Sequence, residues 1–285
     1  MILSMTGFGR AEGVFEGKKI TIDIKSLNSK SFDLNIKIPL RYKEKEFEIR
    51  KILNDRIIRG KVDCYLNLEN LEESTDVKIN KSLIDSYISE LKSVASDGPD
   101  FEYLKMAVRF PDAITSRPDE LSEGEWEALA KIVHAAIDRF EEFRKTEGNI
   151  LHEELGRNLQ NIEKNLAEVV PFEEERIVAV KERYQKSLKE FENVDETRFY
   201  QEMAYFTEKL DISEEKVRLA QHLKYYKEVM DHEDFNGKKL GFISQEIGRE
   251  INTLGSKANH AAIQKLVVMM KDDLEKIKEQ TLNVL

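Results

Sequence analysis

Residues 237–260, with the sequence GKKLGFISQEIGREINTLGSKANH, carry the clearest structural signal in the chain. Their apolar residues recur at steps of three and four, the period of an amphipathic helix, and the stripe consists of Leu240, Ile243, Ile247, Ile251 and Leu254. Roughly a quarter turn away, at about 100° per residue, Glu246, Glu250 and Thr253 stack along one edge. The stretch therefore predicts a helix whose acidic residues border its buried face.

The preceding segment repeats this arrangement. A second apolar stripe of helical period consists of Ile212, Leu219, Leu223, Tyr226 and Met230. Asp211, Glu215, Arg218 and His222 lie within about 60° of one another beside that stripe. If the two helices pack on their apolar stripes, we expect the ionisable columns to meet along one groove. Acids brought close together repel one another unless a divalent cation or intervening bases offset them, so this groove is a candidate metal site.

An alternative explanation of these columns requires no site. The acids of each helix can pair with that helix's own arginine, Arg218 or Arg249, as surface ion pairs. Each such pair contributes well under about 1 kcal/mol to stability. Spacing alone leaves both explanations open.

The composition is that of a folded protein without a membrane segment. The chain has 285 residues, of which 40% are hydrophobic and 35% charged, and no apolar run approaches the roughly 18–20 residues of a membrane span. Because no basic head and long apolar run open the sequence, we expect no secretory signal and a cytoplasmic location. The single cysteine, Cys64, has no disulfide partner and is predicted to be a buried core thiol.

Charge is divided unevenly along the chain. The net charge is −10, yet residues 1–62 hold 14 Lys and Arg against 8 Asp and Glu, which leaves −16 for the remaining residues. This division suits a polyanion that one part holds and another part acts on, and it equally suits electrostatic docking of the two parts on each other. The candidate residues for a basic guiding surface are Arg10, Lys25, Lys30, Arg59 and Lys61.

The order of the predicted elements indicates an α+β fold. Alternating apolar residues predict two or three antiparallel strands within residues 3–38, with a polar hairpin turn at 27–31. A helix, a strand and a second helix complete a small α+β domain, and long helices are predicted for most of the remaining chain. The predicted divisions are an α+β basic domain at 1–100, a connector at 101–121, a long helical hairpin or coiled region at 122–194 and a helical catalytic-candidate domain at 195–285.

Local signals add detail to these divisions. Gly7 and Gly9 interrupt the first strand, where a bulge or a close backbone approach is expected. Ser122, followed three residues later by Glu125, predicts the start of a helix. The segment 146–148, Thr-Glu-Gly, predicts a break or bend in that helix.

The sequence lacks the motifs of several enzyme classes. It contains no GxxxxGK[ST], no GxGxxG after a strand, no HExxH and no CxxC, so no nucleotide cofactor and no ordinary zinc site are expected. Oxygen ligands with one histidine suit Mg²⁺ or Mn²⁺, and the candidate ligands are Asp211, Glu215, His222, Glu246 and Glu250. His222 is a candidate metal ligand, a candidate general acid or base, or a structural histidine paired with a neighbour.

Several sequence blocks, spread from end to end, point to one family. They are SMTGFGRAEG at 4–13, SLNSKSFDLNIKIP at 26–39, RGKVDC at 59–64, KTEGNIL at 145–151, LDISEEKVRLAQH at 210–222 and GKKLGFISQEIGREINTLGSK at 237–257. These blocks resemble the YicC/YloC family of bacterial endoribonucleases. The resemblance implies an α+β amino-terminal domain, a helical carboxy-terminal domain and a ring-like homo-oligomer, expected to be a hexamer. It also implies divalent-metal-dependent cleavage of single-stranded or small regulatory RNA.

The resemblance also assigns family motif positions to this chain. They are Asp211, Glu214, Glu215, Arg218, His222, Gln245, Glu246, Arg249, Glu250, Thr253, Ser256 and Lys257. The chain departs from the family pattern at Gly241, before Phe242, where an acid is more usual, and at Gly248, where a polar residue is expected. Each departure is expected to alter a contact with RNA or metal.

The resulting hypothesis is a metal-dependent endoribonuclease that cleaves phosphodiester bonds in RNA. The candidate catalytic residues are Glu215, His222, Glu246 and Glu250, and the same residues with Asp211 are the candidate metal ligands. The candidate RNA-binding residues are Arg10, Lys25, Lys30, Arg59, Lys61, Arg218, Gln245, Arg249, Ser256 and Lys257. One alternative is metal-independent attack by the RNA 2′-hydroxyl with His222 as base. The other is a non-catalytic oligomeric RNA-binding or adaptor protein.

Overall fold

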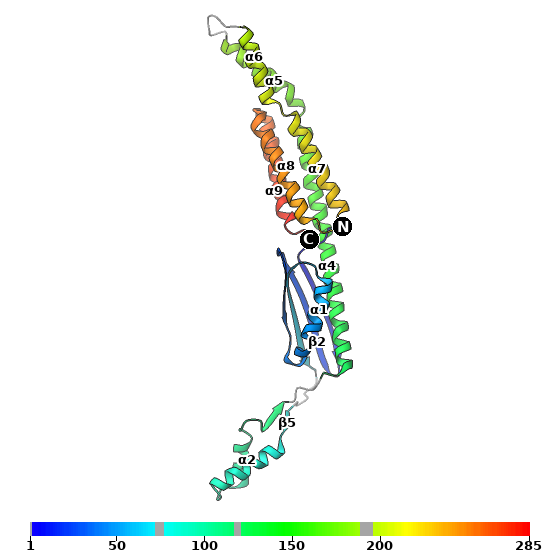
Figure 1. The fold of residues 1–285 in the computed structure, drawn as a ribbon, viewed down its shortest axis with the longest axis vertical. Coiled ribbons are helices and arrows are strands. Elements are labelled where there is room, and N and C mark those ends of the chain that lie inside the picture. The colour runs from blue at the N-terminus through cyan, green and yellow to red at the C-terminus, as the bar shows by residue number, and fades with distance from the viewer. Residues whose placement is uncertain (1, 72–76, 117–120, 189–195) are drawn as a thin grey trace.

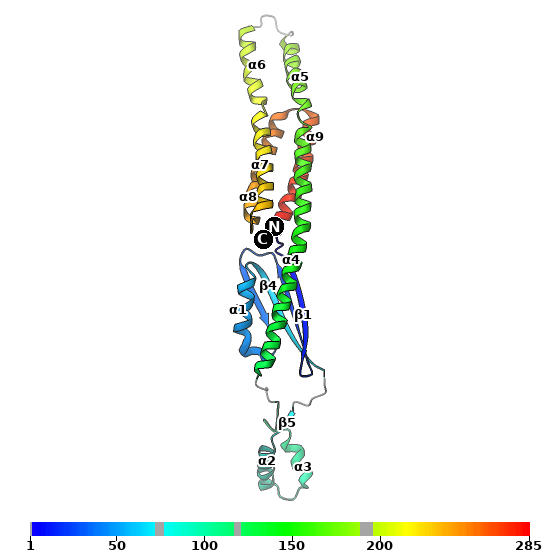
Figure 2. The same ribbon diagram turned by 90° about the vertical axis from the view of Figure 1, so that its right-hand side faces the viewer.

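The computed structural model describes residues 2–71, 77–116, 121–188 and 196–285, which form an elongated molecule (Figure 1). A four-stranded sheet occupies the middle, a helical bundle extends from one end of it and a small unit from the other. One long helix, α4 at Glu123–Ala167, runs beside both the sheet and the bundle (Figure 2). The predicted fold class, an α+β part followed by a mostly helical part, is confirmed.

The sheet is mixed rather than fully antiparallel. Its strands are β1 (Gly7–Phe15), β2 (Lys18–Leu27), β3 (Phe32–Lys37) and β4 (Gly60–Asn70), in the order β1-β2-β4-β3. The β1–β2 and β2–β4 pairs are antiparallel, whereas β3 pairs with β4 in parallel. The hairpin predicted at 27–31 is therefore wrong, because that segment carries the chain past β4 to the sheet edge. A parallel pair requires a crossover, which the short helix η1 (Leu40–Lys45) and α1 (Glu46–Arg56) supply.

Helix α4 is continuous and joins two hydrophobic cores. Its first half covers the inner face of the sheet through apolar residues that include Leu129, Val133 and Phe140. Its second half packs in the bundle with α7 and α9. The break predicted at 146–148 is wrong, and the predicted division at 121–122 falls just before a helix that belongs to both cores.

The predicted start of α4 and the close approach at Gly9 are confirmed. The Ser122 hydroxyl accepts a hydrogen bond from the Glu125 amide at 3.2 Å, which caps the helix. A Cβ atom placed on Gly9 would lie 2.1 Å from the backbone oxygen of Ala136, so only glycine lets α4 lie this close to β1. Strand β1 runs through both glycines without interruption. Cys64 is buried in this core, as predicted.

The small unit contains regular structure in part of the segment predicted as a connector. It consists of β5 (Val77–Ile79), α2 (Lys81–Val94), α3 (Asp100–Ala107) and β6 (Ile114–Ser116), with β5 and β6 antiparallel. Its buried apolar residues are few and include Ile84, Ala107 and Ala113. Such a short apolar pattern gives a weak periodic signal, which is why the sequence indicated only an irregular segment.

The bundle is built from α4 and five further helices of the described chain. They are α5 (Pro171–Leu188), α6 (Glu196–Leu210), α7 (Ser213–His232), α8 (Gly237–Ala258) and α9 (Ala261–Thr281). The predicted stripe of α8 is buried, with every one of its five apolar residues at most 6% exposed. The predicted division at 194–195 lies outside the described residues.

The two chain ends meet where the bundle joins the sheet (Figure 1). Ser4 and Val284 form an antiparallel bridge, and the Leu285 amide donates to the Leu3 carbonyl at 2.9 Å. The buried guanidinium of Arg144 donates to the Met5 carbonyl at 3.0 Å and so ties the amino-terminal segment to α4. These bonds join the sheet and the bundle into one structure.

A buried ion pair at the start of α4 predicts a pH-dependent stability. Glu125 is 2% exposed, and its carboxylate accepts hydrogen bonds from Arg41 Nε and the Tyr42 hydroxyl, both at 2.8 Å. The Arg41 guanidinium holds the pKa of Glu125 below its ordinary value. We expect Glu125→Gln to lower the free energy of unfolding by about 3 kcal/mol at pH 7, because it removes one partner of a buried pair. Urea unfolding of both proteins measures this difference.

The sign of the pH effect follows from the lowered pKa. The contribution of the ionised Glu125 is present above about pH 4.3 and is lost as the pH falls through the lower pKa of the folded state. At pH 3 the gap between wild type and Glu125→Gln should therefore be smaller than at pH 7. Glu123→Gln, an exposed change in the same helical turn, is the control. If the free energies of unfolding of wild type and Glu125→Gln differed equally at both pH values, ionised Glu125 would not be the stabilising group.

Candidate functional site

Helices α7 and α8 pack as an antiparallel hairpin through their buried apolar stripes, and one ion pair marks its register. Lys257 Nζ on α8 lies 2.7 Å from Glu215 Oε1 on α7, so these residues are level with each other. Seven residues are about two helical turns, and stepping seven residues inward from this pair reaches His222 on α7 and Glu250 on α8. From this spacing we infer that His222 and Glu250 lie at about the same height on one edge of the hairpin.

Most of the predicted acids have local partners. Asp211 accepts hydrogen bonds from the Ser213 hydroxyl at 2.7 Å and the Ser213 amide at 3.0 Å, which lower the pKa of Asp211. Glu214 pairs with Arg218, and Glu246 pairs with Arg249 at 2.7 Å. These contacts are the surface ion pairs of the alternative explanation, although Arg218 pairs with Glu214 rather than with Asp211 or Glu215.

His222 and Glu250 differ from the other candidates. Both side chains are partly exposed, and neither makes a hydrogen bond or an ion pair within the described part of the chain. Gln245 is exposed on the adjoining row, while the Ser256 hydroxyl donates to the Thr253 carbonyl at 2.9 Å. The side chains of His222 and Glu250 are therefore free to contact a ligand, as far as the described residues show.

Glu215 is a buried carboxylate with one unused oxygen. The residue is 5% exposed, Oε1 accepts from Lys257, and Oε2 has no hydrogen-bond partner among the described residues. A buried polar atom without a partner is costly unless a bound group completes it. Among the described candidates, Glu215 is thus the one with an unpaired carboxylate oxygen in a buried position.

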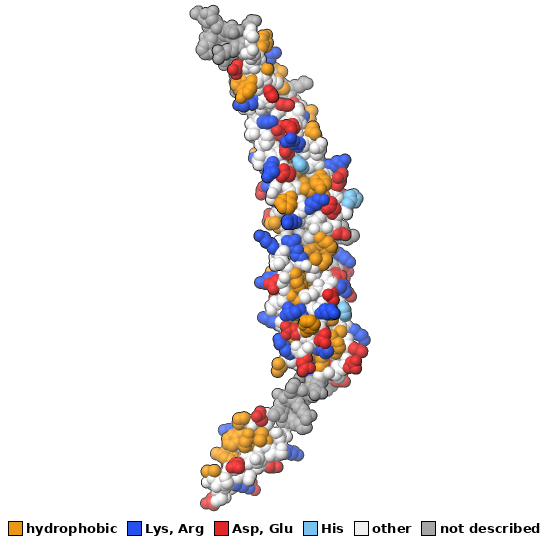
Figure 3. All heavy atoms as spheres, in the orientation of Figure 1, with side chains coloured by type: hydrophobic (Ala, Val, Ile, Leu, Met, Phe, Trp, Pro, Cys, Tyr) orange, Lys and Arg blue, Asp and Glu red, His pale blue; other side chains and the backbone are white. Residues whose placement is uncertain are grey.

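More charged residues surround this pair at the junction of α5, α7 and α8. Glu173 pairs with Lys216, and Arg176 Nη1 lies 3.4 Å from the carbonyl oxygens of Lys257 and Ala258. Burial lowers the pKa of Arg176. Acids and bases alternate here, as they do over the face that Figure 3 shows. The intervening bases remove the repulsion that a divalent cation was expected to offset.

A cavity of about 440 Å³ opens beside Lys257. Its lining residues are Val180, Phe206, Lys209, Leu210, Ser256, Lys257 and Asn259. Lys209 and Lys257 give this cavity ammonium donors, from which phosphate oxygens can accept hydrogen bonds. Lys209 and Arg176 are not among the site residues predicted from the sequence. The signal for Lys209 was its place directly before the LDISEEKVRLAQH block.

The predicted five-ligand metal groove does not form within one chain. Across the residues that the structure describes, no group of three or more His, Cys, Asp and Glu side chains is placed to hold a metal ion. The physical reason is spacing along the hairpin, since Glu215 and Glu250 differ by about two turns, or roughly 10 Å along the axis. The candidates therefore do not fit a preformed metal cage, although the partly exposed carboxylate of Glu250 is available to a cation.

The candidate basic surface lies on the sheet, away from the acids. Arg10, Lys25 and Lys61 alternate with inward residues and so project from the solvent side of the sheet, and Arg10 lies 3.7 Å from Asp23. Lys30 is exposed, and Arg59 Nε donates to the Ser29 carbonyl at 3.0 Å. The sheet and the Lys257 end of α8 lie at different heights along the molecule (Figures 1 and 2), so one chain does not bring the two sets together.

The fold and site define a class of protein: a two-core α+β chain with a lysine-lined cavity next to a buried carboxylate. The chain belongs to the YicC-like endoribonuclease family. The family model described as the endoribonuclease YicC-like N-terminal region matches residues 2–153, and the one described as endoribonuclease YicC-like, C-terminal, matches residues 162–285. The resemblance inferred from the sequence blocks is thereby confirmed.

Two relatives match over their full lengths. A protein of Clostridioides difficile (strain 630) named "Probable endoribonuclease YicC" is 30% identical over 292 residues, and the match covers 100% of both chains. A protein of the same name from Haemophilus influenzae (strain ATCC 51907 / DSM 11121 / KW20 / Rd) is 27% identical over 290 residues, again covering 100% of both. Within the described residues, none of the helices combines the length and the apolar character needed to cross a membrane.

Proposed function

We propose that this chain is an endoribonuclease that cleaves phosphodiester bonds in RNA, single-stranded or small regulatory RNA, with the help of Mg²⁺ or Mn²⁺. The family membership supports the reaction class. The observation that carries the site is Lys257, which lies between the buried carboxylate of Glu215 and the lysine-lined cavity. This arrangement combines a phosphate-binding cation with an unused carboxylate oxygen.

Each residue has a role that its surroundings suit. Lys209 and Lys257 donate to phosphate oxygens of RNA in the cavity, which orients the backbone. His222, level with Glu250, transfers a proton during cleavage. A bound divalent cation would supply a Lewis acid and a more acidic water. Mg²⁺ sites commonly use one or two carboxylates completed by substrate phosphates, so RNA itself can complete a site that one chain leaves open.

We also propose that the chain works as a homo-oligomer, with the hexamer as the expected form. The basic sheet face and the Lys257 cavity are separated within one chain, and a neighbouring chain could bring the two together. Val268 and Met269, exposed apolar residues on α9, offer a contact surface. A mass in solution six times that of the 33.2 kDa chain supports this form, and a monomer mass rules it out.

Removal of divalent cations tests the proposed chemistry. With a single-stranded oligoribonucleotide as substrate, we expect EDTA to reduce cleavage below detection and Mn²⁺ or Mg²⁺ to restore it. Attack by water is expected to leave no cyclic phosphate on the products. Persistent cleavage in EDTA with a 2′,3′-cyclic phosphate end would instead support 2′-hydroxyl attack with His222 as base. RNA binding without cleavage under any cation would support the adaptor alternative.

A further inference from the structure

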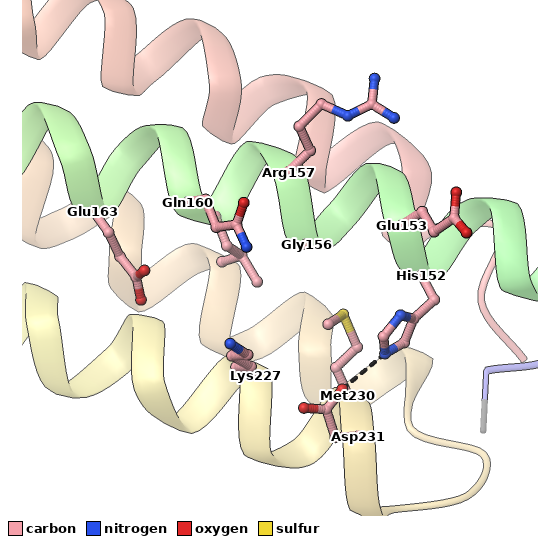
Figure 4. A pocket seen from close by; sticks show the side chains of 10 residues that line it. His152, Glu153, Gly156, Arg157, Gln160, Glu163, Lys227, Met230 and Asp231 are labelled. Atoms are coloured by element: carbon pink, nitrogen blue, oxygen red, sulfur yellow. Dashed lines mark hydrogen bonds and ion pairs between the residues drawn. The ribbon is translucent and has the colours of Figure 1, made fainter.

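A second groove lies between α4 and α7, away from the Lys257 cavity. It has a volume of about 410 Å³, within the usual range for sites that hold a small molecule or a single nucleotide. Figure 4 shows that His152, Gln160 and Glu163 reach into the gap from α4, while Lys227 and Asp231 face them from α7. The two helices thus present different polar groups to one space.

The polar groups of this groove are of mixed charge. His152 Nε2 and Asp231 Oδ1 are 2.7 Å apart across the gap, which fixes the orientation of the imidazole ring. Lys227 supplies a cation, Gln160 an amide that both donates and accepts, and Glu163 an acceptor. The lining holds three acids, Glu153, Glu163 and Asp231, beside Arg157, Lys227 and His152, and this balance does not favour a bare anion. The set suits a ligand that has an anionic end and a hydrogen-bonding end.

The floor of the groove is open because α4 carries a glycine there. Gly156 lies in the middle of a 45-residue helix, where glycine costs about 1 kcal/mol relative to alanine. A Cβ atom on Gly156 would have no neighbour within 4 Å, so packing does not require this glycine. The missing side chain leaves the surface of α4 at Gly156 uncovered, so that a flat ring can lie against it, while Leu159 and Met230 line the groove but are only 3% and 1% exposed.

We propose that the groove binds one unpaired nucleotide of the RNA substrate. The phosphate lies near Lys227 and His152, the base lies over the uncovered helix surface at Gly156, and its polar edge meets Gln160 and Glu163. Hydrogen bonds to the edges of unpaired bases are a common means of RNA recognition. This inference rests on the proposed function and assigns the recognition of single strands to the α4–α7 groove, because a paired base cannot enter it.

RNA binding measured without cleavage tests the proposal. Fluorescence anisotropy of a labelled single-stranded ten-nucleotide RNA, and of a duplex of the same length, is recorded in EDTA. Gly156→Leu fills the groove and should weaken single-strand binding about tenfold, in the range of losing one base contact. Its duplex affinity should stay unchanged. Gln160→Leu should also weaken single-strand binding, and Ala135→Leu, at an exposed site elsewhere on α4, should not.

The outcomes separate this inference from the proposed function. Dependence of single-strand binding on the groove, in a protein that never cleaves RNA, would support the inference and contradict the nuclease. Active cleavage with unchanged single-strand affinity in Gly156→Leu and Gln160→Leu would overturn the inference alone. Equal loss for single strand and duplex would also overturn it. A last outcome would also overturn the inference: Gly156→Leu abolishes the binding of free nucleoside monophosphates and leaves RNA binding unaffected. The groove would then be a site for free nucleotides.

Discussion

Replacement of Glu250 by Gln is expected to slow RNA cleavage by about 10²–10⁴-fold, the usual range for loss of acid–base participation at a catalytic site. Glu250 lies level with His222 on the α7–α8 edge and has no ion pair in the described part of the chain, so its charge is available to substrate or cation. Gln keeps the size of the side chain and removes the charge. Initial cleavage rates of a labelled single-stranded RNA at saturating Mn²⁺ measure the effect.

Two further variants show whether a loss of activity in Glu250→Gln is specific to that carboxylate. Glu228→Gln removes an exposed acid from α7 that pairs only weakly with Lys224, at 3.8 Å, and should leave the rate unchanged. Glu246→Gln should reduce the rate less than Glu250→Gln, because Glu246 is already paired with Arg249. The melting temperature and the RNA affinity of Glu250→Gln should match wild type. A Glu250→Gln enzyme that cleaves at the wild-type rate would remove this edge from the site.

Features of the candidate site that follow from the period of one helix could be predicted from the sequence. Contacts between residues of different helices could not. The buried stripe of α8 and the edge position of Glu250 follow from steps of three and four within one helix. The partner of Glu215 does not, because Lys257 is 42 residues away and is brought level only by the register of the hairpin. The His152–Asp231 contact joins residues 79 apart, and the sequence indicated no partner for His152.

The sheet shows the same limit. Alternation in β2 and β3 identifies strands and their inward faces but carries no information about neighbours. Strand β3 lies on the far side of β4, so β2 and β3, which follow each other in sequence, are not adjacent in the sheet. The helix α1 was predicted, but its role as the crossover between the parallel strands β3 and β4 was not.

Gly148→Ala is expected to destabilise the protein by about 2 kcal/mol, although alanine is the better helix former. The sequence segment Thr-Glu-Gly suggested a helix break, yet α4 is continuous and Gly148 is buried at a crossing. A Cβ atom there would lie 2.1 Å from the backbone oxygen of Ile2, and backbone cannot move aside as a side-chain end can. The segment it would displace carries the Ser4 amide, which donates to the Arg144 carbonyl at 3.1 Å.

Gly156→Ala, two turns along the same helix, is the matched control with the opposite expected sign. Its added Cβ has no neighbour within 4 Å, so the change should stabilise the protein by about 0.5–1 kcal/mol through helix propensity alone. In thermal and urea unfolding, the melting temperature and the free energy of unfolding of wild type should therefore lie between those of the two variants. The same substitution in one helix can change stability in opposite directions only through the atoms that each new methyl group contacts. If Gly148→Ala were as stable as Gly156→Ala, the amino-terminal segment would therefore not pack against α4 as described.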